Sequence, residues 1–109
     1  MRLSYVMKFV ADMDKAVAFY RDTLGLTLKF QSPHWSEFVT GETTLALHPA
    51  SDKNPAGAVE LGFTVEDIEG FHRDKAAAGV VFTRPPTAEH GTKLANLLDS
   101  EGAQISISG

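Results

Sequence analysis

Two stretches decide the fold of this chain: YVMKFVADMD at residues 5–14 and ELGFTVEDIE at residues 60–69. Aligned without a gap, they agree in residue type at nearly every position, and Asp12 falls on Asp67. Each begins as a half-buried strand and ends near an aspartate that suits a helix N-cap, because a carboxylate accepts the free amide hydrogens of the first turn. The repeat therefore predicts one small α+β domain built from two tandem copies of a strand–helix–three-strand unit.

The first strands of the two copies differ in one informative place. In the second copy, Leu61, Phe63 and Val65 alternate with polar or small residues, so we expect them to share one buried face. Lys8 falls where Phe63 sits, which is tolerable only if its ammonium group reaches solvent. The other face of the first strand carries Tyr5, Met7 and Phe9.

A helix and three further strands are predicted in each copy. The apolar residues of the first helix recur at helical spacing, at Met13, Ala16, Val17, Tyr20 and Leu24. Gly25 and Gly79 then end the two helices, because glycine readily adopts the left-handed conformation found just after a helix. The strands lie at approximately 26–31, 35–40 and 43–48 in the first copy and 80–84, 92–98 and 103–108 in the second. Turn signals separate them at Ser32-Pro33, Gly41, Pro85-Pro86 and Asp99–Gly102.

The two copies are expected to fold as a single domain covering residues 1–109. Module 1 covers approximately residues 1–49 and module 2 approximately residues 57–109, with residues 50–56 as a linker. Neither module is expected to be stable alone, because a unit of about 50 residues buries too little surface.

Composition excludes several classes of function. The net charge is −4, and the 10 basic residues are scattered singly, so no nucleic-acid partner is expected. The chain has no cysteine, which removes thiolate metal sites and thiol nucleophiles. No apolar run approaches the roughly 18 residues that would span a bilayer, and the N-terminal residues lack a signal-peptide pattern. We therefore expect a cytoplasmic protein with no membrane partner.

Several motifs resemble the vicinal oxygen chelate superfamily, which includes glyoxalase I, bleomycin-resistance proteins and extradiol dioxygenases. They are VADMDKAVAFYRDTLGL, TTLALHP and NLLDSEGAQISI, and the likeness covers essentially the whole chain. The resemblance implies two βαβββ modules that form a curved mixed sheet, with the helices on its outer face and a ligand cavity on its concave face. It also implies a homodimer, in which the cavity often lies where modules or subunits meet.

Metal-dependent members of that superfamily carry His or Glu at four positions of the concave face. In this sequence those positions hold Tyr5, Ala46, Glu60 and Ser106, of which only Glu60 is a competent ligand. The interpretation we favour is that the chain has no metal cofactor. The alternative is a divalent metal held by shifted ligands, His48 and Glu60, because His48 follows Ala46 by two residues and so shares its face.

The concave face as a whole suggests a small-molecule ligand, held by aromatic stacking and a few hydrogen bonds. Trp35 and Phe38 have opposite parity on their strand, so at most one faces the cavity squarely. His90 lies in the loop TAEHGTK, which in the superfamily often borders the cavity; it is either a proton donor or acceptor there or a plain loop histidine. The candidate ligand-binding residues are Tyr5, Met7, Phe9, Trp35, Phe38, His48, Glu60, His90, Gln104 and Ser106.

Three functions remain open at this point. The first is a metal-independent protein of the bleomycin-resistance type that binds a hydrophobic or aromatic small molecule in a concave cavity at a dimer interface. The second is a metal-dependent lyase, transferase or dioxygenase with the shifted ligands His48 and Glu60. The third is metal-free acid–base catalysis by Glu60, together with Tyr5 or His90.

Overall fold

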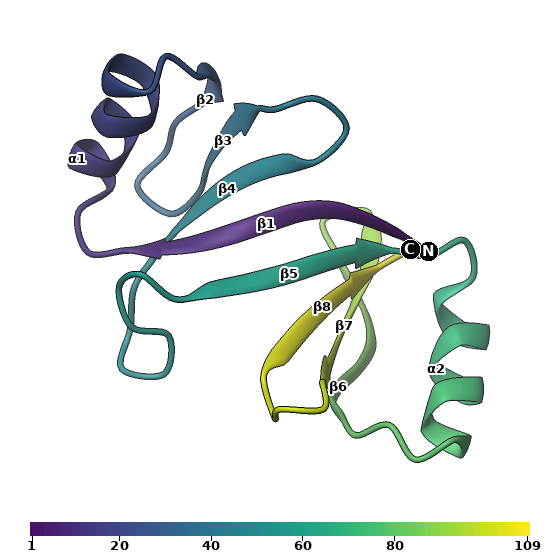
Figure 1. Cartoon of the computed structure of the whole chain (residues 1–109). Coiled ribbons are helices and arrows are strands. Elements are labelled where there is room, and N and C mark those ends of the chain that lie inside the picture. The colour runs from purple at the N-terminus through teal and green to yellow at the C-terminus, as the bar shows by residue number, and fades with distance from the viewer. The chain divides into compact units, whose positions relative to one another are not determined.

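The computed structural model describes residues 1–109 and contains two compact units. We call residues 4–59 the N-terminal unit and residues 60–109, with residues 1–3, the C-terminal unit. Both follow the predicted order of one strand, one helix and three strands (Figure 1). The first set of elements is β1 (Arg2–Val10), α1 (Met13–Ala18), the π-helical turn η1 (Phe19–Thr23), β2 (Thr27–Phe30), β3 (Ser36–Val39) and β4 (Thr44–Pro49). The second set is β5 (Val59–Thr64), α2 (Ile68–Ala77), β6 (Phe82–Glu89), β7 (Thr92–Leu98) and β8 (Gln104–Ser108).

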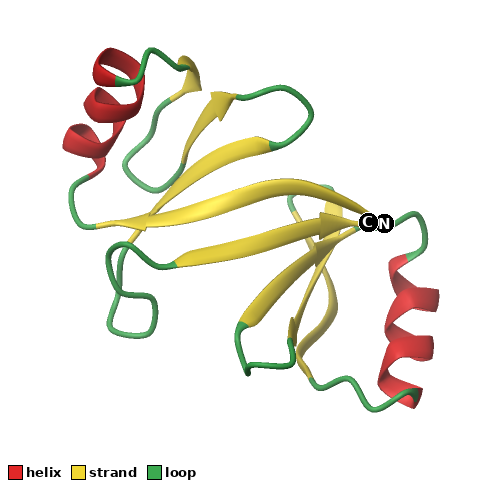
Figure 2. Ribbon diagram, viewed as in Figure 1, coloured by secondary structure: helices red, strands yellow, loops and turns green.

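The strands of each unit form mixed pairings in the same pattern. In the N-terminal unit the strand order is β2-β3-β4-β1, with β1 and β4 parallel and the other pairs antiparallel. In the C-terminal unit the order is β5-β8-β7-β6, with β5 and β8 parallel. Each unit also carries one α-helix, drawn in red in Figure 2. The predicted α+β class and the tandem βαβββ modules are therefore confirmed.

The core of the N-terminal unit lies between α1 and one face of its strands. Val17 from α1, Phe38 from β3 and Leu47 from β4 form a buried cluster. Tyr20 adds its ring, whose centroid lies 5.7 Å from that of Phe38. Full burial of a side chain of this size contributes about 1.5–3 kcal/mol, so this cluster holds the helix on the strands.

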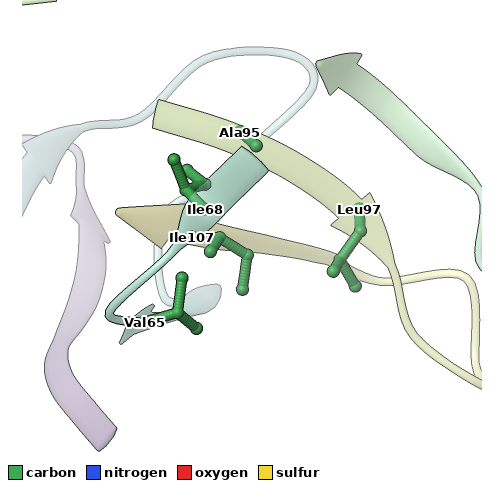
Figure 3. Close-up of a cluster of buried hydrophobic side chains, with 5 residues drawn as sticks. All are labelled: Val65, Ile68, Ala95, Leu97 and Ile107. Carbon is green, nitrogen blue, oxygen red and sulfur yellow. The ribbon is translucent and has the colours of Figure 1, made fainter. Parts of the chain in front are cut away.

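The C-terminal unit has an equivalent core under α2. Val65, Ile68, Ala95, Leu97 and Ile107 form its buried cluster, and Figure 3 shows their side chains close together. Ile107 is fully buried. The two cores thus occupy the same place in the repeated unit.

Both helices begin as the sequence predicts. Asp12 Oδ1 accepts the backbone N–H of Lys15 at 3.1 Å, and Asp67 Oδ1 accepts that of Gly70 at 3.0 Å. Such caps stabilise a helix by about 0.5–2 kcal/mol.

The end of the first helix differs from the prediction. Its last turn is η1, in which the N–H of Leu24 donates to the carbonyl of Phe19 at 3.0 Å. A π-helical turn contains more residues than an α-helical turn, so residues beyond it rotate away from the expected face. Leu24, which the helical spacing puts on the buried face, is 55% exposed for this reason.

The turn predicted at Pro85-Pro86 is wrong, because both prolines lie inside β6. Strand β6 stands at the end of the strand order and pairs only with β7, with register shifts between Phe82 and Arg84 and between Arg84 and Thr87. Proline lacks an N–H and is tolerated in edge strands and at bulges, where no hydrogen bond is lost. The strand consequently continues to Glu89 rather than ending at residue 84.

The structure also shows the surroundings of two residues in the first strands of the two copies, Leu61 and Lys8. Leu61 is 38% exposed, so it does not share the burial of Val65, which packs beside Ile68 of α2. Lys8 is half-buried, and its Nζ donates to the carbonyl of Gly57 at 2.9 Å. A backbone carbonyl thus satisfies the ammonium group that the sequence places at an apolar position.

Candidate functional site

An aromatic cluster covers the face of the N-terminal unit that lies away from α1. Alternation places Tyr5 and Phe9 of β1 on this face, together with His48 of β4 and Trp35, just before β3. The rings meet edge to face, with centroid distances of 6.0 Å for Tyr5–Trp35, 6.2 Å for Trp35–His48 and 5.5 Å for Phe9–His48. We call these four residues the aromatic face. Edge-to-face pairs of this kind contribute about 0.5–1.5 kcal/mol beyond their burial.

The four rings differ in how far they reach solvent. Tyr5, Trp35 and His48 are half-buried, whereas Phe9 is only 3% exposed. Phe9 is therefore a buried ring that packs against His48. The other three rings form the part of the aromatic face that solvent can reach. Met7, on the same side of β1, is buried as well.

A carboxylate fixes the orientation of the indole. Trp35 Nε1 donates to Glu37 Oε2 at 2.7 Å, and Lys29 Nζ lies 3.8 Å from Glu37 Oε1. Glu37 was not singled out by the sequence, although it shares the parity of Trp35 on its strand. The period-two pattern W-x-E is the signal that places the two side chains on one face.

Phe38 lies on the opposite side of β3 from Trp35. It is fully buried and packs against Val17 of α1 in the core of the N-terminal unit. Of the two aromatic candidates with opposite parity, Trp35 is thus the one on the face away from the helix, and Phe38 belongs to the core.

A hydrogen-bonded polar group occupies the corresponding face of the C-terminal unit. Glu60 of β5 is 5% exposed, and its carboxylate accepts from Gln104 Nε2 at 3.1 Å and from the hydroxyl of Ser106. Asn96 Nδ2 donates in turn to Ser106 Oγ at 3.2 Å. We call these four residues the Glu60 network. Both groups that bond the carboxylate are neutral, so its charge is held by hydrogen bonds alone.

The sequence predicted three members of the Glu60 network and missed the fourth. Glu60, Gln104 and Ser106 were all candidates, and the structure brings them together. Asn96 is the residue that was missed. Its signal is a single amide in the otherwise apolar stretch LANLL of β7, on the side that faces away from Ala95 and Leu97.

His90 lies at the tip of the hairpin that joins β6 and β7. Its φ of 50° and that of Gly91, 81°, are the two left-handed conformations that a tight two-residue hairpin turn requires. Its side chain is 91% exposed, and its Nε2 lies 3.9 Å from Glu89 Oε1. The structure thus gives His90 a turn position, with no contact to the Glu60 network.

Of the four positions expected to hold metal ligands, Glu60 alone carries a strong ligand for a divalent metal. No group of three or more His, Asp or Glu side chains is arranged to hold a metal ion. Ser106 donates its hydroxyl to Glu60 and is a weak ligand, and Ala46 has no donor atom. His48 lies in the N-terminal unit and Glu60 in the C-terminal unit. Their pairing as shifted ligands stays a prediction.

Two exposed ion pairs shift pKa values of side chains within them. The hydrogen bond from Arg21 lowers the pKa of Asp22, and the same bond raises the pKa of Arg21. Arg84 donates to Glu89 at 2.6 Å and, with a smaller contribution from His90, lowers the pKa of Glu89. Both pairs lie in solvent, outside the aromatic face and the Glu60 network.

The sequence matches the glyoxalase/bleomycin resistance protein/dioxygenase superfamily over residues 2–107. The chain belongs to this superfamily. None of the curated proteins matches it at a significant level. No helix of the structure is long and apolar enough to cross a membrane.

Solved structures with the same fold come from several bacteria. A variant of methylmalonyl-CoA epimerase from Streptomyces coelicolor has a TM-score of 0.82 at 19% identity, covering 99% of this chain and 93% of that chain. An NAD-dependent benzaldehyde dehydrogenase from Legionella pneumophila has a TM-score of 0.77 at 22% identity, covering 95% and 96%. A superfamily member from Vibrio splendidus has a TM-score of 0.73 at 16% identity, covering 98% and 97%. At these identities the likeness establishes the fold alone.

Proposed function

We propose that this protein binds a hydrophobic or aromatic small molecule on the aromatic face and needs no metal ion to do so. The observation that carries the proposal is the set of three half-buried rings, Tyr5, Trp35 and His48, on a face that no helix of their unit covers. Ligand sites are commonly lined by aromatic side chains with a few polar groups that fix orientation. Membership of the superfamily supports the same function, since it includes bleomycin-resistance proteins.

Trp35 provides a direct test because it is the only tryptophan in the chain. Its indole N–H signal and its fluorescence report on this face alone. We expect naphthalene derivatives to shift both, and Tyr5→Leu to weaken their binding. Phe19→Leu is the matched control, because Phe19 is also an exposed aromatic residue of the N-terminal unit, at 48% exposure, but lies in η1.

The role of metal is tested by repeating the titration after treatment with a chelator. Unchanged binding supports the proposal. Loss of binding, with recovery on addition of Zn²⁺ or Mn²⁺, would instead favour the metal-dependent lyase, transferase or dioxygenase with His48 and Glu60 as ligands.

We also propose that the protein is a homodimer, as other members of its superfamily suggest. Light scattering coupled to size exclusion measures the mass directly. The expected mass is twice that of the 11.8 kDa chain, and a mass equal to one chain would contradict this part of the proposal.

A second candidate function is metal-free acid–base catalysis by Glu60. The observation that favours it is a carboxylate that is 5% exposed and oriented by neutral donors, which is how enzymes hold a general base in place. The structural likeness to a methylmalonyl-CoA epimerase suggests a first substrate to test. That substrate is the thioester methylmalonyl-CoA. When it is incubated with the protein in D₂O, its α-proton should exchange for deuterium, and Glu60→Gln should abolish the exchange. Equal exchange by the variant would exclude Glu60 as the base.

A further inference from the structure

The ring of His48 has one nitrogen bonded within the chain and one without a partner. Its Nδ1 lies 2.8 Å from the carbonyl oxygen of Pro49, the next residue along β4. That is the single hydrogen bond of the ring, whose other contacts are the edge-to-face ones with Phe9 and Trp35. Nε2 is therefore a polar atom set among aromatic rings.

The contact to Pro49 decides which nitrogen carries the proton. A carbonyl oxygen only accepts hydrogen bonds, so we assign the proton to Nδ1, which donates to it. In the neutral ring the other nitrogen then carries a lone pair. Nε2 of His48 is consequently an acceptor that needs a donor.

Other groups on this face narrow the class of ligand. The indole N–H of Trp35 is already bonded to Glu37, so it is not available to a ligand acceptor. Glu37 also places a carboxylate beside the rings, but Lys29 Nζ lies 3.8 Å from Glu37 Oε1 and offsets its charge. The face thus offers one free acceptor, Nε2 of His48, among aromatic walls.

We propose that the aromatic face selects aromatic molecules that carry a hydrogen-bond donor, such as a phenolic hydroxyl or a ring N–H, and that Nε2 of His48 accepts that hydrogen. This inference rests on the proposed function, because it specifies the ligand class of the same face. Ring stacking supplies the contact area, and His48 distinguishes donors from molecules of the same shape that lack one.

A matched pair of probes tests the inference. We expect 2-naphthol to bind roughly 3- to 10-fold more tightly than 2-methoxynaphthalene, which corresponds to one net hydrogen bond. Dissociation constants come from nuclear magnetic resonance titrations of the Trp35 indole signal. If both probes bind equally well, the role of His48 is refuted while the proposed function stands. If neither binds, the proposed function fails together with the inference.

Variants and nitrogen spectra of the His48 ring test whether its Nε2 causes the preference for 2-naphthol. His48→Phe keeps an aromatic ring but removes the acceptor, so the two probes should then bind with equal affinity. Phe19→Leu should preserve the preference seen in the wild type. Nitrogen spectra of the unmutated protein give an answer that does not depend on how a variant folds. The His48 Nε2 signal should be that of an unprotonated nitrogen and should move with 2-naphthol but not with its methyl ether. A proton on Nε2, or equal movement with both probes, would overturn the inference.

Discussion

Removing the Ser106 hydroxyl tests whether the Glu60 network stabilises the C-terminal unit. In Ser106→Ala the Glu60 carboxylate loses one donor at a site that is 5% exposed, and Asn96 Nδ2 loses its acceptor. A hydrogen bond to a charged group contributes about 1.5–3 kcal/mol and one between neutral groups about 0.5–1.5 kcal/mol. We therefore expect the free energy of unfolding to fall by about 2–4 kcal/mol.

The matched control is Ser108→Ala, two residues further along β8 on the same side. Ser108 Oγ lies 3.0 Å from Thr64 Oγ1 and 3.4 Å from the carbonyl oxygen of Phe63, all neutral groups. Its loss should cost about 0.5–1.5 kcal/mol. Urea unfolding should be followed by far-ultraviolet circular dichroism, because the single tryptophan reports only on the N-terminal unit.

A double-mutant cycle then isolates the contact itself. Glu60→Gln, Ser106→Ala and the double variant together give the coupling energy between the two side chains. We expect a coupling of about 1 kcal/mol or more, since the Ser106 hydroxyl donates directly to the Glu60 carboxylate. Equal losses for Ser106→Ala and Ser108→Ala, with no coupling to Glu60, would show that Ser106 does not stabilise the C-terminal unit through the Glu60 carboxylate.

Three further predictions concern other parts of the chain. Asp67→Ala should lower the free energy of unfolding by about 0.5–2 kcal/mol, because Asp67 caps α2; Asp67→Asn, which retains a capping oxygen, should recover most of it in the same urea experiment. Arg84 lowers the pKa of Glu89, so their interaction stabilises the fold above the unfolded value near 4.5 and is lost as the pH falls below it. In Arg84→Gln, the free energy of unfolding should therefore fall less than in the wild type as the pH is lowered through that range. His90→Asn should raise the melting temperature slightly, because Asn-Gly suits this turn. The same variant should bind 2-naphthol as tightly as the wild type, and weaker binding would show that His90 contributes to the ligand site.

The sequence predicted those features that depend on local pattern. The repeat, the caps at Asp12 and Asp67 and the parity of each strand all follow from residues that are neighbours along the chain. Parity put His48 on the face of Ala46 and gave Trp35 and Phe38 opposite faces, and the structure shows that Trp35 is the one whose ring meets Tyr5 and His48. Features of this kind need no knowledge of what packs against them.

The features that were missed depend on tertiary context. Pro85 and Pro86 signal a turn in isolation, and only the edge position of β6 makes them acceptable in a strand. Leu24 fits a regular helix, and the π-helical turn that rotates it outward depends on the bond between its own N–H and Phe19. Asn96 becomes meaningful only when β7 lies beside β8, because its partner is on the other strand.

The two prolines of β6 have a consequence for how copies of this chain meet. An open strand edge invites a strand of another molecule to join it through backbone hydrogen bonds, which is a common route to aggregation. Pro85 and Pro86 have no backbone N–H to donate to a strand of another molecule. The register shifts around them also interrupt the regular hydrogen-bond pattern of β6. We expect this margin of the protein to resist extension of the sheet.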